Sequence, residues 1–139
     1  MYLDSSALVK RYNPEPDSGH VGEVVVGFTL VISDLAVGEV WAALLDKERD
    51  GAISAMVRNK LWKVFLDDVE EGVLRLIPLD GVMIRDANEM MLRGHPHVPL
   101  RTLDAIHLAT FGSVITGPIF TKDKQMLAGA KLLGFATVE

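Results

Sequence analysis

Residues 100–110, LRTLDAIHLAT, place a single acid inside a segment that otherwise has the composition of a buried helix. Leucine, alanine and isoleucine surround Asp104, and residues of this kind are usually found in protein cores. Burying a carboxylate is costly unless a cation or hydrogen-bond donors compensate for it. Asp104 is therefore either an acid of the first helical turn, after a cap at Thr102 and paired with Arg101, or part of a site that binds a cation.

Short apolar runs alternate with helical patterns on both sides of this stretch. Five runs are strand candidates: residues 1–3, 28–33, 73–78, 117–121 and, more weakly, 135–139. Between them, apolar residues recur with the spacing of amphipathic helices, as in Val37, Val40, Trp41 and Leu44. Buried strands that alternate with helices predict an α/β fold of three layers, with a central parallel sheet of four or five strands and helices on both faces.

Length and composition restrict the functional classes. The 139 residues contain no repeat or linker, which predicts one domain over residues 1–139. Without cysteine, disulfides and thiolate metal sites are excluded, and no secretory signal or membrane span is expected, so we expect a cytoplasmic protein. A net charge of −5 means that any contact with nucleic acid depends on a local basic patch or on bound cations.

Four acids stand where the ends of the predicted strands should gather. Asp4 ends the first strand candidate, Glu39 lies in the helix after the second, Asp104 opens the helix before the fourth, and Asp123 follows the fourth. Right-handed crossovers bring the carboxyl ends of parallel strands to one edge of the sheet, where ligands bind. The four side chains are therefore expected to meet there.

A cluster of four carboxylates needs positive charge. Like charges repel and force some of the acids to take up protons. Glu39 has no basic residue three or four positions away in the sequence, so no local ion pair accounts for it. A divalent ion such as Mg²⁺ prefers oxygen ligands, binds phosphates and can activate water. The pattern therefore favours metal-assisted cleavage of a phosphodiester.

Each acid also has a structural interpretation. Asp4 and Asp123 can each be the N-cap of the helix that follows, and Glu39 can be a solvated helix residue. Capping does not prevent metal binding, because a capping acid at a strand end already lies at the right edge. Asp34 is interpreted as a helix cap. His107 is interpreted as a packed, hydrogen-bonded histidine and not as a ligand or a base.

Four segments together resemble the motifs of the PIN-domain family. They are YLDSSALVK, SDLAVGEVWAAL, LRTLDAIHLAT and IFTKDKQMLAGAKLLGF, which carry the four acids in the family's order and span nearly the whole chain. The sequences of these motifs are most similar to those of the toxin ribonucleases of VapBC-type toxin–antitoxin pairs. The resemblance implies a PIN-like fold, a Mg²⁺- or Mn²⁺-dependent endoribonuclease, a homodimer, and inhibition by a small cognate antitoxin. Residues 51–98 carry no motif that assigns interface residues.

The resemblance also implies roles for individual residues. One or two divalent ions would be held by Asp4, Glu39, Asp104 and Asp123. Ser6 and Thr121 would support these ligands, and the candidate contacts to RNA phosphates are Arg101, Lys122 and Lys124. The alternative is a PIN-like regulatory module that binds a partner without catalysis. A receiver-like phosphoacceptor is disfavoured, because the last strand candidate, FATVE, offers no lysine.

Overall fold

The computed structural model describes residues 1–13, 18, 21–114 and 117–138. The strands in this part of the chain are β1 (Tyr2–Leu3), β2 (Leu30–Ser33), β3 (Leu74–Ile77), β4 (Ile119–Phe120) and β5 (Thr137–Val138). The helices are α1 (Ser5–Tyr12), α2 (Val21–Val24), α3 (Asp34–Arg49), α4 (Ala55–Glu70), α5 (Gly81–Gly94), α6 (Thr102–Val114) and α7 (Lys124–Leu132). Every predicted strand is present in a shortened form. None of the described helices combines the length and the apolar character that crossing a bilayer requires.

The strands form one parallel sheet in the order β3-β2-β1-β4-β5. Tyr2 of the central strand pairs with Val31 on one side and with Ile119 on the other. The strand order reverses at β1, because β2 and β3 lie to one side of it and β4 and β5 to the other. Such a reversal leaves a crevice at the carboxyl end of the central strand. Asp4 is the residue that immediately follows β1.

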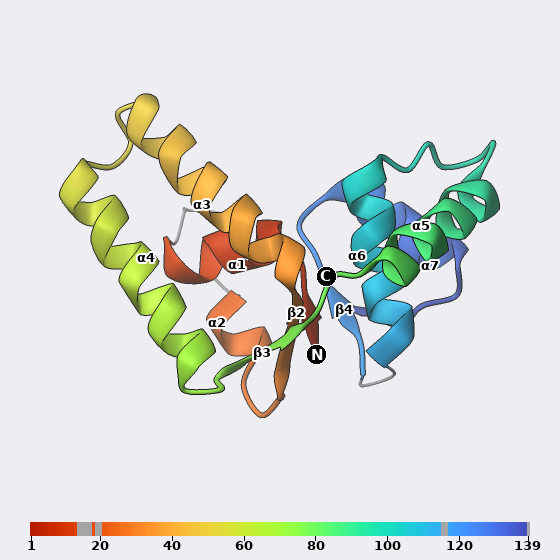
Figure 1. Cartoon of the computed structure of the whole chain (residues 1–139), viewed down its shortest axis with the longest axis horizontal. Coiled ribbons are helices and arrows are strands. Elements are labelled where there is room, and N and C mark those ends of the chain that lie inside the picture. Colours follow the sequence, from red (N-terminus) through yellow and green to blue (C-terminus); the bar gives the residue numbers. More distant parts are fainter. Residues whose placement is uncertain (14–17, 19–20, 115–116, 139) are drawn as a thin grey trace.

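Helices cover both faces of the sheet, as the sequence predicted. Figure 1 shows α1–α4 on one side of the strands and α5–α7 on the other, with α3 and α4 extending beyond the sheet as a helical pair. Alternate strand residues point to opposite faces. Leu3 therefore packs in the core beneath α1–α4, whereas Tyr2 packs in the core beneath α6 and α7. This alternation directs the Tyr2 phenol toward α6.

One expectation about a helix start is wrong. Asp34 is the first residue of α3 and not its cap, because the hydroxyl of Ser33 accepts the backbone N–H of Leu35. Ser33 ends β2 and keeps an extended backbone, which aims its short side chain back at the first turn. The strand therefore leads directly into α3, which carries Glu39.

Phe65 joins the projecting α4 helix to the rest of the protein. Its side chain is fully buried, stacks on Trp62 at 5.2 Å between ring centroids, and meets Tyr12 of α1 edge-on at 5.6 Å. Replacing Phe65 with alanine leaves a cavity and removes these ring contacts. We expect the Phe65→Ala change to lower the free energy of unfolding by about 3–5 kcal/mol, measured by chemical denaturation.

The matched control for this change is Val64→Ala on the same helix. Val64 is 45% exposed, and its truncation should alter the free energy of unfolding by less than about 0.5 kcal/mol. Equal effects of the two substitutions would contradict the assignment of Phe65 to the core.

Candidate active site

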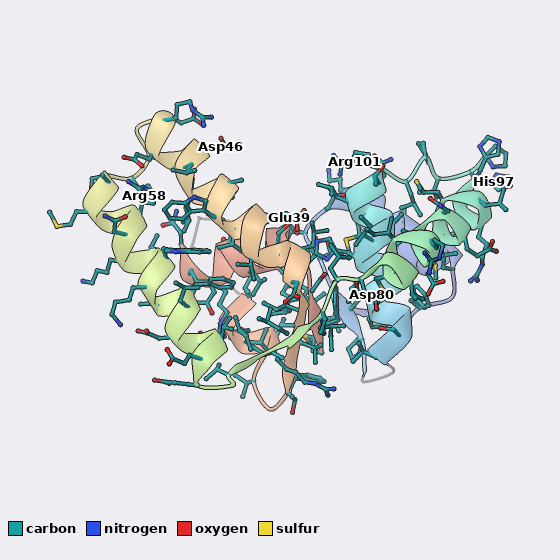
Figure 2. All side chains as sticks on the ribbon, viewed as in Figure 1. Glu39, Asp46, Arg58, Asp80, His97 and Arg101 are labelled. Atoms are coloured by element: carbon teal, nitrogen blue, oxygen red, sulfur yellow. The ribbon has the colours of Figure 1, made fainter. Side chains whose placement is uncertain are left out.

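Side chains from four separate segments line one cavity at the carboxyl end of β1. Its volume is about 450 Å³, and its lining includes all four acids singled out from the sequence: Asp4, Glu39, Asp104 and Asp123. Figure 2 labels Glu39 on α3 and Arg101 just before α6, which line the cavity from opposite helical layers. The cavity lies where the strand order reverses, as expected for a ligand site in a parallel sheet.

Asp4 is buried at the floor of the site, with only 3% of its surface exposed. As the N-cap of α1, its Oδ1 accepts the backbone N–H of Ala7 at 3.0 Å. The Ser6 hydroxyl donates to the same carboxylate at 2.8 Å, and the Thr121 hydroxyl donates to its Oδ2 at 2.7 Å. Asp4 is thus bonded both to the first turn of α1 and to the segment that follows β4.

The hydroxyls of Ser6 and Thr121 also accept hydrogen bonds. Ser6 accepts the backbone N–H of Lys122 at 2.9 Å, and Thr121 accepts the backbone N–H of Asp123 at 3.0 Å. Each hydroxyl therefore connects the Asp4 carboxylate to the backbone between β4 and α7. This network sets the position of Asp123 relative to Asp4, although the two residues are far apart in the sequence.

The environment of Asp4 disfavours its negative charge. Burial raises the pKa of the Asp4 carboxyl above its ordinary value of 3.8. Hydrogen bonds from Thr121, Ala7 and Ser6, together with the nearby His107, oppose the effect of burial without cancelling it. Asp4 is therefore a carboxylate whose ionised form would gain from an added cation.

Asp123 is more exposed and more strongly compensated. It is the N-cap of α7, and its Oδ1 accepts the backbone N–H groups of Gln125 and Met126 at 2.8 and 2.9 Å. Burial alone would raise the pKa of the Asp123 carboxyl. The N–H of Met126, the guanidinium of Arg101 and the N–H of Gln125 outweigh it and leave the pKa below its ordinary value.

Arg101 joins two of the four acids. Its Nε donates to Oδ2 of Asp104 at 2.9 Å, and its Nη2 donates to Oδ2 of Asp123 at 2.7 Å. The expected pairing of Asp104 with Arg101 is confirmed. The expected cap at Thr102 is wrong, because Thr102 is already helical and Asp104 instead accepts the backbone N–H of Arg101 at 3.2 Å.

Glu39 has a partner that the sequence pattern did not assign. Nε2 of His107 lies 2.7 Å from Oε2 of Glu39, and Nδ1 of His107 lies 2.7 Å from the phenol oxygen of Tyr2. His107 is 2% exposed, which confirms the interpretation of a packed, hydrogen-bonded histidine. Its contact with a candidate metal ligand was missed. The available signal was its position three residues after Asp104, on the same side of a helix.

The candidate phosphate contacts are not equivalent. Arg101 lines the cavity, whereas Lys122 and Lys124 are absent from the residues that line it. The Lys122 ammonium lies 5.1 Å from the centre of the Phe120 ring, and Lys124 is exposed at the start of α7. The structure therefore places one of the three basic groups among the acids and the other two on the surrounding surface.

The carboxylates share a cavity, but they are not arranged as a ready-made metal site. Among the described residues, no three histidine or acidic groups are already placed to hold one ion. The chemistry of the lining nevertheless fits a hard divalent cation, since every candidate ligand is a carboxylate. Arg101 now supplies positive charge to Asp104 and Asp123, so an ion shared by these two acids requires the guanidinium to move.

Comparison with known proteins assigns the family. The PIN domain model matches residues 1–132, and the chain therefore belongs to the PIN-domain family. Over 141 residues it is 36% identical to Ribonuclease VapC46 of Mycobacterium tuberculosis (strain ATCC 25618 / H37Rv), an alignment that covers 99% of this chain and 95% of that protein. The resemblance noted in the sequence motifs is confirmed.

Solved structures share the fold. The Sarcin-Ricin loop cleaving toxin VapC20 of Mycobacterium tuberculosis superposes with a TM-score of 0.73 at 17% identity, covering 99% of this chain and 98% of that one. A toxin–antitoxin complex from Klebsiella pneumoniae superposes with a TM-score of 0.62 at 14% identity, covering 99% and 95% of the two chains. These similarities extend over nearly the full length of the chain.

The raised pKa of Asp4 predicts that its charge destabilises the metal-free protein. Well below pH 3.8 the carboxyl is protonated in both the folded and the unfolded chain, and stability is lost as the pH rises through the higher pKa of the folded state. We expect Asp4→Asn to melt at a higher temperature than the wild type at pH 7 in EDTA. Thermal melts across pH should show this advantage decreasing as the pH falls toward and below 3.8.

The control for this measurement is Asp46→Asn. Asp46 lies on the exposed part of α3 (Figure 2) and is paired with Arg49. Its replacement should not raise the melting temperature. A lower melting temperature for Asp4→Asn at pH 7 would mean that its hydrogen bonds outweigh the cost of burying its charge.

Proposed function

We propose that this protein is a divalent-metal-dependent endoribonuclease that acts as the toxin of a type II toxin–antitoxin pair. The observation that carries the proposal is the convergence of Asp4, Glu39, Asp104 and Asp123 on one cavity from four separate segments of the chain. Membership in the PIN-domain family and the similarity to a ribonuclease support it. A structural role for each acid alone gives no reason for all four to line one cavity.

The charge of the cavity supports a role for metal ions. Four carboxylates line it, and the guanidinium of Arg101 is the one lysine or arginine charge among the described lining residues. An RNA phosphate would be repelled by this excess of negative charge. Bound Mg²⁺ or Mn²⁺, as one or two ions, would neutralise the acids and attract the phosphate, so that an acidic protein can bind RNA.

The residues of the chain have distinct tasks in this proposal. Asp4, Glu39, Asp104 and Asp123 hold the ions, and the hydroxyls of Ser6 and Thr121 orient the Asp4 carboxylate. A bound divalent ion supplies positive charge that lowers the pKa of the attacking water and stabilises negative charge on the leaving oxygen. Arg101, once released from its acids, can bind a phosphate of the substrate, and Lys122 and Lys124 can contact the RNA outside the cavity.

The partners follow from the same role. A toxin of this type requires a small cognate antitoxin, and the similarity to a toxin–antitoxin complex supports such a partner. We propose that the chain forms a homodimer, as the family resemblance implies. Exposed apolar side chains on α5, namely Val82, Ile84 and Leu92, offer surface for protein contacts. Because the proposed substrate is cellular RNA, we propose a cytoplasmic location.

Cleavage of RNA by the purified protein tests the proposal. The wild type should cleave RNA in the presence of Mg²⁺ or Mn²⁺ and should lose this activity in EDTA. Asp104→Asn should abolish cleavage, because it removes a charged ligand, whereas the exposed control Asp46→Asn should cleave like the wild type. Cleavage can be followed by gel electrophoresis of labelled RNA, with circular dichroism to confirm folding.

Full activity of folded Asp104→Asn, or undiminished activity in EDTA, would contradict this assignment of the site. Binding of RNA or of an antitoxin without any cleavage would instead favour the non-catalytic binding module. The contact of Arg101 with two of the acids is the observation that makes this alternative worth testing.

Arg101 should affect metal binding and RNA binding in opposite directions. Arg101→Gln removes the charge that now pairs with Asp104 and Asp123, so Mn²⁺ should bind more tightly, as measured by calorimetry. The same change should weaken RNA binding, because a guanidinium is lost from the cavity. The control Arg49→Gln removes a surface charge paired with Asp46 and should change neither affinity.

A further inference from the structure

The contact between Glu39 and His107 belongs to a longer buried chain of hydrogen bonds. His107 of α6 lies between the phenol of Tyr2 on the central strand and the carboxylate of Glu39 on α3, with 2.7 Å at each contact. Tyr2 and His107 are 1% and 2% exposed, and the Glu39 side chain is 20% exposed. The chain therefore runs from the interior of the sheet to the wall of the cavity.

The direction of each hydrogen bond follows from the groups involved. An ionised carboxylate only accepts, so Nε2 of His107 must carry the proton that points to Glu39. In the neutral imidazole, Nδ1 is then the acceptor, and it receives the O–H of Tyr2. A tyrosine phenol is a donor at neutral pH, so the O–H of Tyr2 is available for this bond. The two bonds thus specify one tautomer and one ring orientation of His107.

Glu39 has a longer and more flexible side chain than the three aspartates, so it depends more on a partner that fixes its orientation. Glu39 is in the second turn of α3, its side chain has three rotatable bonds, and no basic residue lies three or four positions away on its helix. The imidazole binds Oε2, which leaves Oε1 to contact a cation. A fixed carboxylate loses less conformational entropy when an ion binds, so its ligand contacts are pre-organised.

We propose that His107 is a positioning residue, which holds the Glu39 carboxylate in a metal-binding orientation and is itself oriented by Tyr2. The inference rests on the proposed function, because it assigns Glu39 to the metal site. His107 itself lines the cavity, but in this role it acts on the ion only through Glu39. Its effect passes through one hydrogen bond, from Nε2 to Oε2 of Glu39, and the rigidity of that bond comes from the sheet through Tyr2.

Two substitutions of His107 test the contacts of its two ring nitrogens separately. The amide nitrogen of Gln can occupy the place of Nε2 and donate to Glu39, whereas the shorter Asn can occupy the place of Nδ1 and bond only with Tyr2. Both variants lose the aromatic ring, and Asn also loses one more methylene of packing at this buried position. A purely structural role for His107 would make the loss of Mn²⁺ affinity follow the loss of melting temperature, whereas a positioning role makes Gln retain Mn²⁺ affinity beyond what its stability accounts for.

The experiment measures Mn²⁺ binding to the intact chain by calorimetry in the absence of RNA, with thermal melts to establish folding. His107→Asn should weaken Mn²⁺ binding by about 10- to 100-fold, the usual range for loss of a group that orients a metal ligand. His107→Gln should retain affinity within a few-fold of the wild type. At saturating Mn²⁺, the rate of RNA cleavage by His107→Gln should be closer to the wild-type rate than that of His107→Asn.

Tyr2→Phe keeps the ring packing and removes only the O–H that orients His107. It should weaken Mn²⁺ binding by less than His107→Asn does, and it carries the test if His107→Asn does not fold. The positioning role would be overturned if Tyr2→Phe and every His107 variant that folds bound Mn²⁺ as tightly as the wild type. In that case the wild type would still bind Mn²⁺ and cleave RNA, so the proposed function would stand. Failure of the wild type to bind Mn²⁺ would overturn the proposed function and this inference with it.

Discussion

The site depends on one buried carboxylate at the end of the central strand. Asp4 caps α1 through Oδ1 and accepts the Thr121 hydroxyl through Oδ2, so a single side chain joins the start of α1 to the segment after β4. Its position follows from the reversal of strand order at β1. Since burial disfavours its charge, the surrounding structure must supply hydrogen-bond donors and, in the proposed function, a cation.

Helix capping and metal binding are compatible uses of the same acids. In both Asp4 and Asp123, Oδ1 accepts backbone N–H groups at a helix start, whereas Oδ2 faces a side-chain donor. Asp123 therefore gives one oxygen to its helix start and pairs the other with Arg101 at the cavity, whereas both oxygens of Asp4 are bonded within the fold although Asp4 lines the same cavity. The predicted capping roles of both acids are confirmed, and the metal-binding role that we propose is compatible with them.

Side chains of the protein compensate two of the acids in one way and Glu39 in another. The Arg101 side chain is 62% exposed, so its ion pairs with Asp104 and Asp123 are screened by water and easily exchanged. His107 is buried, its bond to Tyr2 is buried as well, and its bond to Glu39 is partly buried at the cavity wall. In the proposed function, a cation that enters the cavity would compete with the first kind of contact, whereas the second kind would keep Glu39 in place. Arg101, whose ion pairs exchange easily, immediately precedes α6, and His107, whose contacts are more buried, lies on α6 itself.

The order of the strands and of the longer helices, the four acids and the family motifs could be predicted from the sequence, because these depend on local periodicity and on residue type. The short helix α2 was not predicted. Residues 30–33 and 74–77 form strands where β-branched, apolar runs predicted them, and Asp4 caps a helix as its position suggested. The contacts between side chains could be read only from the folded structure. The bond from His107 to Glu39 and that from Arg101 to Asp123 join residues on different elements, and no periodicity encodes the rotamer or the distance between them. Such contacts arise when the sheet and both helical layers are packed together, because packing then fixes where each side chain ends.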